Sequence, residues 1–228
     1  MTIESTSDIV RRMSGIRVHP VIILDDLAHA VPAAQALRDG GVPVAEITMR
    51  TPCAADAIRA IATECPDVLV GAGTVLTPAQ AAEARAAGAR FFVTPGFSPA
   101  VVDYCLEHAI PIFPGICTPT ELEAAMDKGL RVVKFFPAEP LGGAEFLKVM
   151  ASPYSGVSFL PSGGITMESL SAYLALDIVV SCGCNWLAPR DTIRAGDFRG
   201  ITRNASRTIA IAHPKAIAHP KAVSHAGG

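Results

Sequence analysis

Short apolar runs alternate with alanine-rich segments along almost the whole chain, and this alternation limits the fold more than any other feature. The runs are continuously apolar, as is typical of parallel strands that are buried on both faces. Repeated βα units of this kind predict a parallel sheet. The predicted strands are Val18–Leu24, Val44–Met49, Val68–Thr74, Phe91–Thr94, Ile110–Pro114, Val132–Phe136, Ser158–Pro161 and Ile178–Ser181.

Helical segments are predicted between these runs, with proline at several of their starts. Pro78, Pro99 and Pro119 fall in the first turn of three segments, where a missing N–H costs nothing. The expected helices are His29–Asp39, Ala54–Glu64, Pro78–Ala87, Pro99–His108, Pro119–Lys128, Gly143–Met150, Met167–Ala175 and Phe198–Ile211.

The number of units and the chain length together favour one architecture. Eight βα units in 228 residues, half of them apolar, predict an α/β protein with a single (β/α)8 TIM barrel. The barrel domain is expected to occupy residues 1–211 and to include a short N-terminal helix. An open doubly wound sheet is the alternative that the same pattern leaves.

The C-terminal residues do not continue the pattern. Ile-Ala-His-Pro-Lys-Ala occurs twice in succession within residues 211–222, and a proline every six residues forbids a regular helix. Residues 212–228 are therefore expected to form a disordered tail. Its histidines recur at an interval of six, at His213, His219 and His225, and would chelate a metal ion only weakly.

Charge and cysteine spacing disfavour several classes of function. A formal net charge of -2 and a pI near 6.3 provide no basic field, so neither nucleic acid nor a membrane surface is expected as a partner. The N-terminus lacks the features of a signal peptide and no stretch is long enough to span a membrane, which predicts a cytoplasmic protein. The pair Cys182-Gly-Cys184 has no second ligand pair, so we expect no metal and no other cofactor.

Lys134 carries an ammonium group in the middle of an apolar run. The chain has only five lysines, and the other four lie in polar, helix-like segments or in the tail. Burying an unpaired ammonium is costly, and the usual relief is loss of the proton, which leaves a neutral, nucleophilic amine. The alternative is a structural lysine that forms a salt bridge at the end of a strand.

Further polar residues end the neighbouring strands, where the reacting groups of parallel barrels lie. With a period of two, Glu46, Thr48 and Arg50 share one face of the second strand and point into the barrel. Thr74 ends the third strand. A lysine can form an iminium with a ketone, a carboxylic acid can transfer protons, and an arginine can bind a carboxylate through two hydrogen bonds. The structural alternatives are an ion pair for Glu46 and an exposed loop charge for Arg50.

A glycine turn follows the seventh strand. Its sequence is Ser162-Gly-Gly-Ile-Thr, and such a turn before a helix presents backbone N–H groups to an anion. Because TIM barrels often bind phosphate after their seventh and eighth strands, this turn is a candidate phosphate site.

As a set, these motifs resemble the class I 2-keto-3-deoxy-6-phosphogluconate (KDPG) aldolases, which often also cleave 4-hydroxy-2-oxoglutarate (KHG). The resemblance extends over about residues 16–210. The stretches that carry it are Glu46-Ile-Thr-Met-Arg50, Val70-Gly-Ala-Gly-Thr-Val-Leu76, Thr94-Pro-Gly96, Pro114-Gly-Ile116, Val133-Lys-Phe-Phe-Pro-Ala-Glu139 and Pro161-Ser-Gly-Gly-Ile165.

The resemblance implies a homotrimeric (β/α)8 barrel in which Lys134 forms a Schiff base with pyruvate and Glu46 is the general acid and base. The implied substrate is KDPG, which is split into pyruvate and glyceraldehyde 3-phosphate, with KHG, split into pyruvate and glyoxylate, as a second one. The implied binding residues are Arg50, Thr74, Pro95 and Phe135 for pyruvate, and Ser162, Gly163, Gly164 and Asn185 for phosphate.

One segment departs from the family pattern. Many members have Gly-Gly-Ser-Trp after the eighth strand, whereas this chain has Gly183-Cys-Asn-Trp186. Asn185 can still donate a hydrogen bond, but Cys184 is expected to put a side chain where bare backbone would approach an oxyanion.

Because of this departure, other substrates are alternatives: the galactonate epimer, KHG alone or an unphosphorylated keto acid. A metal-dependent aldolase is disfavoured, since no histidine ends a predicted strand at the mouth. The rival from a different class is a non-catalytic barrel that binds sugar phosphates.

Overall fold

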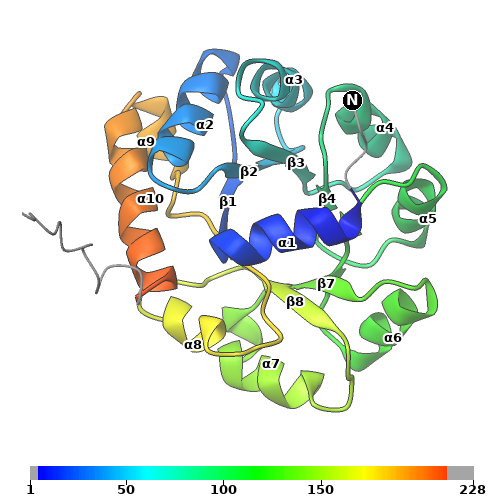
Figure 1. Ribbon diagram of the computed structural model, residues 1–228. Coiled ribbons are helices and arrows are strands. Elements are labelled where there is room, and N and C mark those ends of the chain that lie inside the picture. Colours follow the sequence, from blue (N-terminus) through cyan, green and yellow to red (C-terminus); the bar gives the residue numbers. More distant parts are fainter. Residues whose placement is uncertain (1–4, 215–228) are drawn as a thin grey trace, which may run out of the picture.

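Parallel strands form the interior of the protein and helices surround them (Figure 1). The structure is a computed structural model that describes residues 5–214. The strands are β1 Val18–Ile22, β2 Val44–Thr48, β3 Leu69–Gly73, β4 Phe92–Val93, β5 Ile112–Phe113, β6 Gly115–Ile116, β7 Val132–Phe135, β8 Ser158–Pro161 and β9 Cys182–Cys184. The α-helices are α1 Thr6–Ile16, α2 Ala30–Asp39, α3 Ala54–Glu64, α4 Pro78–Ala86, α5 Pro99–Glu107, α6 Pro119–Asp127, α7 Gly143–Ala151, α8 Leu170–Leu174, α9 Arg190–Arg194 and α10 Phe198–Ala212. Two short 3₁₀ helices are η1 Leu27–His29 and η2 Glu139–Leu141.

The strands pair in parallel and form two connected groups. One sheet has the order β5-β4-β3-β2-β1-β9 and the other the order β6-β7-β8. Pro114 separates β5 from β6 within one extended stretch, and it supplies a carbonyl to the N–H of Lys134 at 2.9 Å. Isolated bridges from Phe159 to Val179 and from Ser162 to Gly183 link β8 to the stretch that contains β9. The predicted α/β fold with a curled parallel sheet is confirmed.

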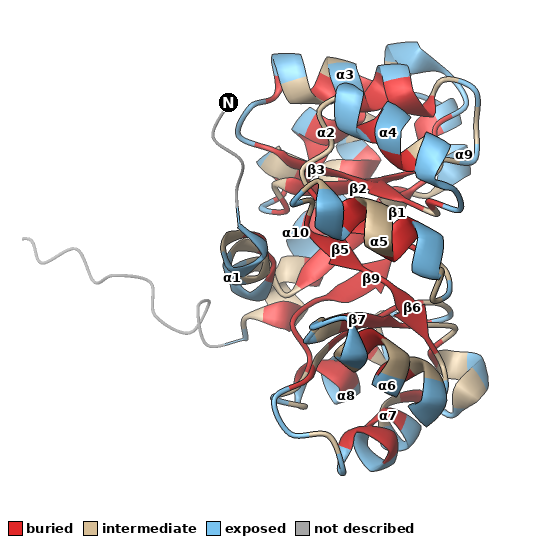
Figure 2. Ribbon diagram, turned by 90° about the vertical axis from the view of Figure 1, so that its right-hand side faces the viewer, coloured by how far each residue is buried: buried red, intermediate tan, exposed pale blue. Residues whose placement is uncertain are grey.

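The strands are almost entirely buried, whereas the helices around them have both buried and exposed residues (Figure 2). All five positions of β2 and all five of β3 are buried, because one face points to the interior and the other to the helices. Most buried side chains are aliphatic, and the largest fully buried ones are aromatic, among them Phe91, which needs the space that a glycine leaves. A Cβ on Gly71 would lie 2.4 Å from the ring of Phe91. The apolar runs are therefore needed on both faces of the sheet.

Helix starts agree with the predicted signals. Pro78, Pro99 and Pro119 each occupy the first turn of a helix. At the start of α6, Thr118 and Glu121 form a capping box, in which each side chain accepts a hydrogen bond from the other residue's backbone N–H. These local signals fix where most helices begin.

Helix α1 crosses the end of the sheet at which the strands begin (Figure 1). Val10 and Ser14 on α1 border a hollow together with Ile112 at the start of β5 and Val132 at the start of β7. The C-terminal ends of the strands lie at the opposite end. Within the described part of the chain, no helix is both long and apolar enough to cross a membrane.

The eighth predicted strand is misplaced. The structure has β9 at Cys182–Cys184 and not at Ile178–Ser181, because the segment that pairs with β1 matches Val18 with Cys182. Val179 forms only an isolated bridge. Helix α9 was not predicted, and α8 is shorter than expected. The predicted tail, residues 212–228, starts at the last residue of α10. From residue 215 onward it lies outside the described residues.

Candidate active site

A cavity of about 430 Å³ lies at the C-terminal ends of the strands. Its walls come from strand ends and from the loops that follow them, as expected for a parallel α/β fold. The predicted site residues that line it are Arg50, Thr74, Pro95, Lys134, Ser162, Gly163, Gly164 and Asn185. The remaining two, Glu46 and Phe135, do not line it.

Lys134 lies near the end of β7 and is only 6% exposed. Its Nζ lies 3.9 Å from Oε1 of Glu46 and 4.9 Å from the ring centroid of Phe136. The ring offers a favourable face to a cation, which suits both an ammonium and a positively charged iminium. The amine also lines the cavity, so it is accessible to a small ligand.

Glu46 lies behind Lys134 and is completely buried. A Cβ on Gly73 would lie 2.2 Å from Oε1, so glycine at this position makes room for the carboxyl group. The other oxygen, Oε2, lies 3.4 Å from Nε2 of His19. Within residues 5–214, neither carboxyl oxygen accepts a hydrogen bond of good geometry. Such a group is unusual in a folded protein, and it indicates a functional role.

The electrostatics of Glu46 are set by opposing effects. Burial alone would raise the pKa of Glu46, but the charge of Lys134 and the contact with His19 outweigh it, so this pKa lies below its ordinary value. The carboxylate is therefore the favoured form of Glu46 at neutral pH when Lys134 is charged.

Arg50 and Thr74 follow β2 and β3, which are adjacent in the sheet. The two loops are joined because Met49 N donates to Gly73 O at 2.8 Å. Thr74 has a φ of 54°, a left-handed conformation that costs energy for a residue with a branched side chain. Arg50 is exposed, and within the described residues its guanidinium has no carboxylate partner. A free guanidinium at the cavity wall can bind an anionic group of a ligand.

Pro95 is held at the cavity by the neighbouring strand. Thr94 Oγ1 donates to Gly96 O at 2.7 Å and accepts from Gly115 N at 3.2 Å. A Cβ on Gly115 would lie 2.2 Å from Pro95 O, so the two backbones pack directly against each other. The pyrrolidine ring therefore forms a rigid part of the wall.

The glycine turn after β8 presents N–H groups to the cavity. Gly163 and Gly164 have φ values of 96° and 82°, which glycine adopts without strain. Ala138 N donates to Ser162 O, and Glu139 N donates to Gly163 O, at 2.8 and 3.0 Å. Because C=O and N–H of one planar peptide point in opposite directions, the N–H groups of Gly163 and Gly164 point away from residues 138–139. Gly163 and Gly164 both line the cavity, so these N–H groups are candidate donors to an anion there.

The departure at Cys184 does not affect the cavity wall. Cys184 is buried, its thiol donates to Cys182 O at 3.3 Å, and it does not line the cavity, whereas Gly183 and Asn185 do. The expectation that its side chain would hinder an oxyanion is therefore wrong. Because residues alternate along an extended chain, the thiol and the Asn185 side chain point in opposite directions.

The interpretation of Phe135 as a pocket residue is also wrong. Phe135 is fully buried and stacks on Phe146 of α7, with ring centroids 5.9 Å apart. Its neighbour Phe136 lines the cavity and lies beside Lys134. The period of two along a strand explains the difference, since residues 134 and 136 share one face and residue 135 the other.

Sequence reasoning missed His19, which is 2% exposed and contacts Glu46. Its Nδ1 lies 2.9 Å from Oγ of the buried Ser181. The signal was present in the sequence, because His19 interrupts an apolar run as Lys134 does. The same test applied to His19 would have identified it.

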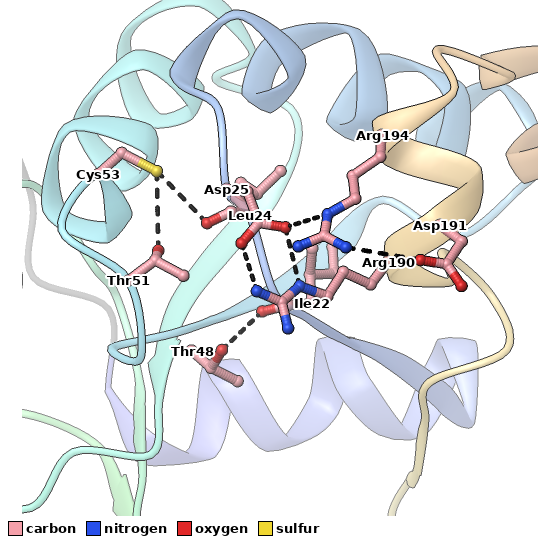
Figure 3. A network of polar contacts seen from close by, with 9 residues as sticks. All are labelled: Ile22, Leu24, Asp25, Thr48, Thr51, Cys53, Arg190, Asp191 and Arg194. Atoms are coloured by element: carbon pink, nitrogen blue, oxygen red, sulfur yellow. Dashed lines mark hydrogen bonds and ion pairs between the residues drawn. The ribbon is translucent and has the colours of Figure 1, made fainter.

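One wall of the cavity is formed by Val21 and Ile23 at the end of β1. The chain beyond them is fixed at Asp25, which accepts hydrogen bonds from Arg190 and Arg194 of α9 (Figure 3). The end of β1 is also bonded to β2, because Thr48 Oγ1 donates to Ile22 O at 2.9 Å. We call the three residues Asp25, Arg190 and Arg194 the mouth clamp. It holds the end of β1 against α9.

The residues that the structure describes do not suggest a metal centre. Between residues 5 and 214, no three or more His, Cys, Asp or Glu side chains are grouped so that they could hold a metal ion. Of the histidines in the predicted tail, His219 and His225 lie outside the described residues. The polar groups of the cavity instead combine an amine, a guanidinium, backbone N–H groups and a carboxyl group beside the amine.

In this parallel α/β fold, a buried lysine and a buried carboxylate lie beside a cavity that a glycine turn also lines. This arrangement is expected of an aldolase that forms a Schiff base. Residues 9–204 match the family model described as KDPG and KHG aldolase. The chain therefore belongs to the KDPG and KHG aldolase family.

Individual relatives agree with this assignment. The chain is 49% identical over 203 residues to the 2-dehydro-3-deoxy-phosphogluconate aldolase of Treponema pallidum, covering 89% of this chain and 97% of that protein. It is 50% identical over 192 residues to the KHG/KDPG aldolase of Escherichia coli K12, covering 84% and 90%. A crystal structure of KDPG aldolase from Legionella pneumophila, with pyruvate captured as a covalent carbinolamine, has a TM-score of 0.84 and 36% identity, covering 87% and 97%.

Proposed function

We propose that this protein is a class I aldolase that splits KDPG into pyruvate and glyceraldehyde 3-phosphate, and that KHG is a second substrate. One observation carries the proposal: Lys134 lines the cavity, and its Nζ lies 3.9 Å from the fully buried carboxyl group of Glu46. The names of the relatives in Treponema pallidum and Escherichia coli support the same substrates.

In the first half of the reaction, Lys134 transfers its ammonium proton to the carboxylate of Glu46 and, now neutral, attacks the C2 carbonyl of the substrate. The adduct is a carbinolamine, and Glu46 donates the proton with which its hydroxyl leaves as water. The product is an iminium whose positive charge lies near the face of Phe136. The carboxylate that remains on Glu46 stabilises the same charge.

In the second half, Glu46 accepts the proton of the C4 hydroxyl. The C3–C4 bond breaks, its electron pair moves into the iminium to form an enamine, and the aldehyde leaves. Glu46 then returns its proton to C3, and water hydrolyses the resulting iminium, which releases pyruvate and restores the ammonium of Lys134. A single carboxyl group serves every proton transfer because it lies directly behind the amine.

Substrate binding is assigned to the two ends of the cavity. Arg50, whose guanidinium is free of carboxylate partners in the described residues, binds the substrate carboxylate beside Thr74 and Pro95. The N–H groups of Gly163 and Gly164, with Ser162 and Asn185, bind the phosphate. The Cys184 thiol lies outside the cavity wall, so it leaves room for a phosphate group at this end.

We further propose that residues 1–211 form a closed (β/α)8 barrel and that the barrel assembles as a cytoplasmic homotrimer. The bridges from Phe159 to Val179 and from Ser162 to Gly183 support closure between β8 and β9. Exposed apolar side chains on α7, Phe146 and Val149, support an association surface. The described cysteines are all free, which fits a reducing compartment.

Borohydride trapping tests the mechanism. Reduction in the presence of pyruvate should add a pyruvyl group to the peptide that contains Lys134, as read by mass spectrometry. A protein that binds KDPG without forming an adduct would instead be a sugar-phosphate binding barrel, and loss of activity in a chelator would indicate a metal-dependent aldolase. Comparing kcat/KM for KDPG, its galactonate epimer, KHG and the unphosphorylated keto acid identifies the substrate.

A further inference from the structure

Behind the proposed catalytic pair, a second layer of polar side chains extends into the interior. His19 on β1 contacts Oε2 of Glu46 through Nε2 at 3.4 Å, and its Nδ1 lies 2.9 Å from Oγ of Ser181. All three side chains are at most 2% exposed, and neither His19 nor Ser181 lines the cavity. The layer is therefore separated from any ligand by Glu46.

The hydrogen-bonding partners determine which tautomer His19 adopts. Glu46 and Lys134 already form a buried pair of opposite charges, so an imidazolium would add an unbalanced charge to a dry interior. The thiols of Cys182 and Cys184 on β9 do not balance it, because burial raises the pKa of both thiols and keeps them neutral. A ring that accepts from Ser181 Oγ at Nδ1 carries its proton on Nε2, which faces Glu46.

The backbone around His19 is adapted to this contact. His19 pairs with Gly183 in the parallel register of β1 and β9. A Cβ on Gly183 would lie 3.1 Å from Nε2 of His19 and 2.6 Å from Oγ of Ser162. Glycine at this position thus leaves the space that both side chains occupy. On the other side of the carboxyl group, Gly73 provides the same kind of space.

We propose that His19 is a positioning residue for the aldolase reaction, which directs its Nε2–H at Oε2 of Glu46 and thereby holds the carboxylate toward Lys134. The inference rests on the proposed function. Nε2 and Oε2 are 3.4 Å apart, so a small movement of either side chain brings them to hydrogen-bond distance. A donor on the carboxylate favours its ionised form, so His19 also sets how readily Glu46 takes up a proton.

Three variants of the full-length protein test this role. His19→Leu removes the donor and keeps an apolar side chain of similar volume, His19→Gln retains an N–H that can reach the carboxylate, and Ser181→Ala removes only the bond that fixes the ring. His108→Leu, far from Glu46 on the outer helix layer, is the matched control. For each protein, kcat and KM for KDPG cleavage are measured as a function of pH, and thermal melting reports folding.

For His19→Leu we expect the acidic limb of the kcat/KM profile to move up by about one pH unit, because Glu46 without the donor holds its proton more tightly. At neutral pH, kcat should fall by about tenfold with KM unchanged, since His19 lies outside the cavity. His19→Gln should recover most of both effects, and Ser181→Ala should show a smaller shift in the same direction. Borohydride should still label Lys134 in every variant.

Several outcomes would overturn the inference. One is a folded His19→Leu protein with the profile and kcat of the wild type. Another is equal impairment of His19→Leu and His19→Gln without a pH shift, which would mean that His19 only fills space. If His19→Leu does not fold, the shifts in His19→Gln and Ser181→Ala decide the question. A wild-type protein without aldolase activity or adduct would overturn the proposed function as well, whereas an active wild type with unaffected variants overturns this inference alone.

Discussion

Among the described residues, Asp25 and Glu46 are carboxylates that each contact two basic side chains, and they differ in burial and in the length of these contacts. Asp25 in the mouth clamp is partly exposed and accepts from Nε of Arg190 and Nε of Arg194, each at 2.8 Å (Figure 3). Glu46 is fully buried, and its contacts with Lys134 and His19 are 3.9 and 3.4 Å long. The exposed carboxylate is saturated with hydrogen bonds and the buried one is not.

The difference separates a structural ion pair from a reactive one. A carboxylate with short hydrogen bonds to two guanidinium groups has little capacity left for a ligand, and its protonation would break them. A buried carboxylate without good hydrogen bonds has unused acceptor capacity that a substrate hydroxyl can fill. Arginine, which stays charged, serves the clamp, and lysine and histidine, which can lose a proton, serve the site.

The largest expected effect follows from removing the amine. Lys134→Met keeps the length of the side chain but cannot form an iminium, so kcat should fall by about 10⁴-fold or more. Borohydride with pyruvate should then label no lysine. The control is Lys128→Met, which removes a lysine that pairs with Asp103 on the surface and should keep both activity and labelling. Residual labelling of Lys134→Met at another residue would assign the Schiff base elsewhere.

The second largest effect is expected for Glu46→Gln. The amide keeps the shape but cannot accept a proton, so kcat for KDPG cleavage should fall by about 10² to 10⁴-fold, measured in the steady state. Labelling of Lys134 by pyruvate should slow but persist, because the amine is intact. Glu123→Gln, which changes a surface carboxylate bonded to Tyr154, should have no effect on kcat. A Glu46→Gln enzyme with near-normal kcat would mean that another group transfers the proton.

A smaller effect is expected at the phosphate end of the cavity. Asn185 is exposed, so Asn185→Ala should fold normally and lose one hydrogen bond to phosphate. KM for KDPG should rise by about tenfold with kcat unchanged, because one such bond to a charged group is removed. The unphosphorylated substrate provides the control, since its KM should not change. Equal changes for both substrates would assign Asn185 to another part of the ligand.

Much of this site could be predicted from the sequence because its residues lie at ends of strands with clear boundaries. Helix Ala54–Glu64 and strand Ser158–Pro161 coincide with the prediction. Lys134 was found because it puts a charge into an apolar run, and Glu46 because it lies near a strand end on the face that the period of two turns inward. The strand Cys182–Cys184 was missed, since Cys-Gly-Cys lacks the β-branched and aromatic residues that indicate strands.

Other features depend on contacts that no local pattern encodes. His19 contacts Glu46 because β1 and β2 are neighbours, with Val21 opposite Glu46. The mouth clamp joins Asp25 to residues 165 and 169 positions further along the chain, and short helix α9, which provides them, has no apolar periodicity.

The smallest effect is expected for the mouth clamp, through Asp25→Asn. The clamp is partly exposed, so its ion pairs should add little stability, and kcat should stay within about twofold of the wild type.

The hydrogen bonds from Arg190 hold the pKa of Asp25 well below its usual range. This lowered pKa means that the clamp stabilises the fold above the ordinary aspartate pKa of about 4 and loses that contribution as the pH falls below it. The small difference in Tm between wild type and Asp25→Asn should therefore be present at neutral pH, shrink in acid and shrink in high salt. A large loss of kcat in Asp25→Asn with an unchanged Tm would show that the clamp takes part in the reaction, and would remove the distinction between the two carboxylates.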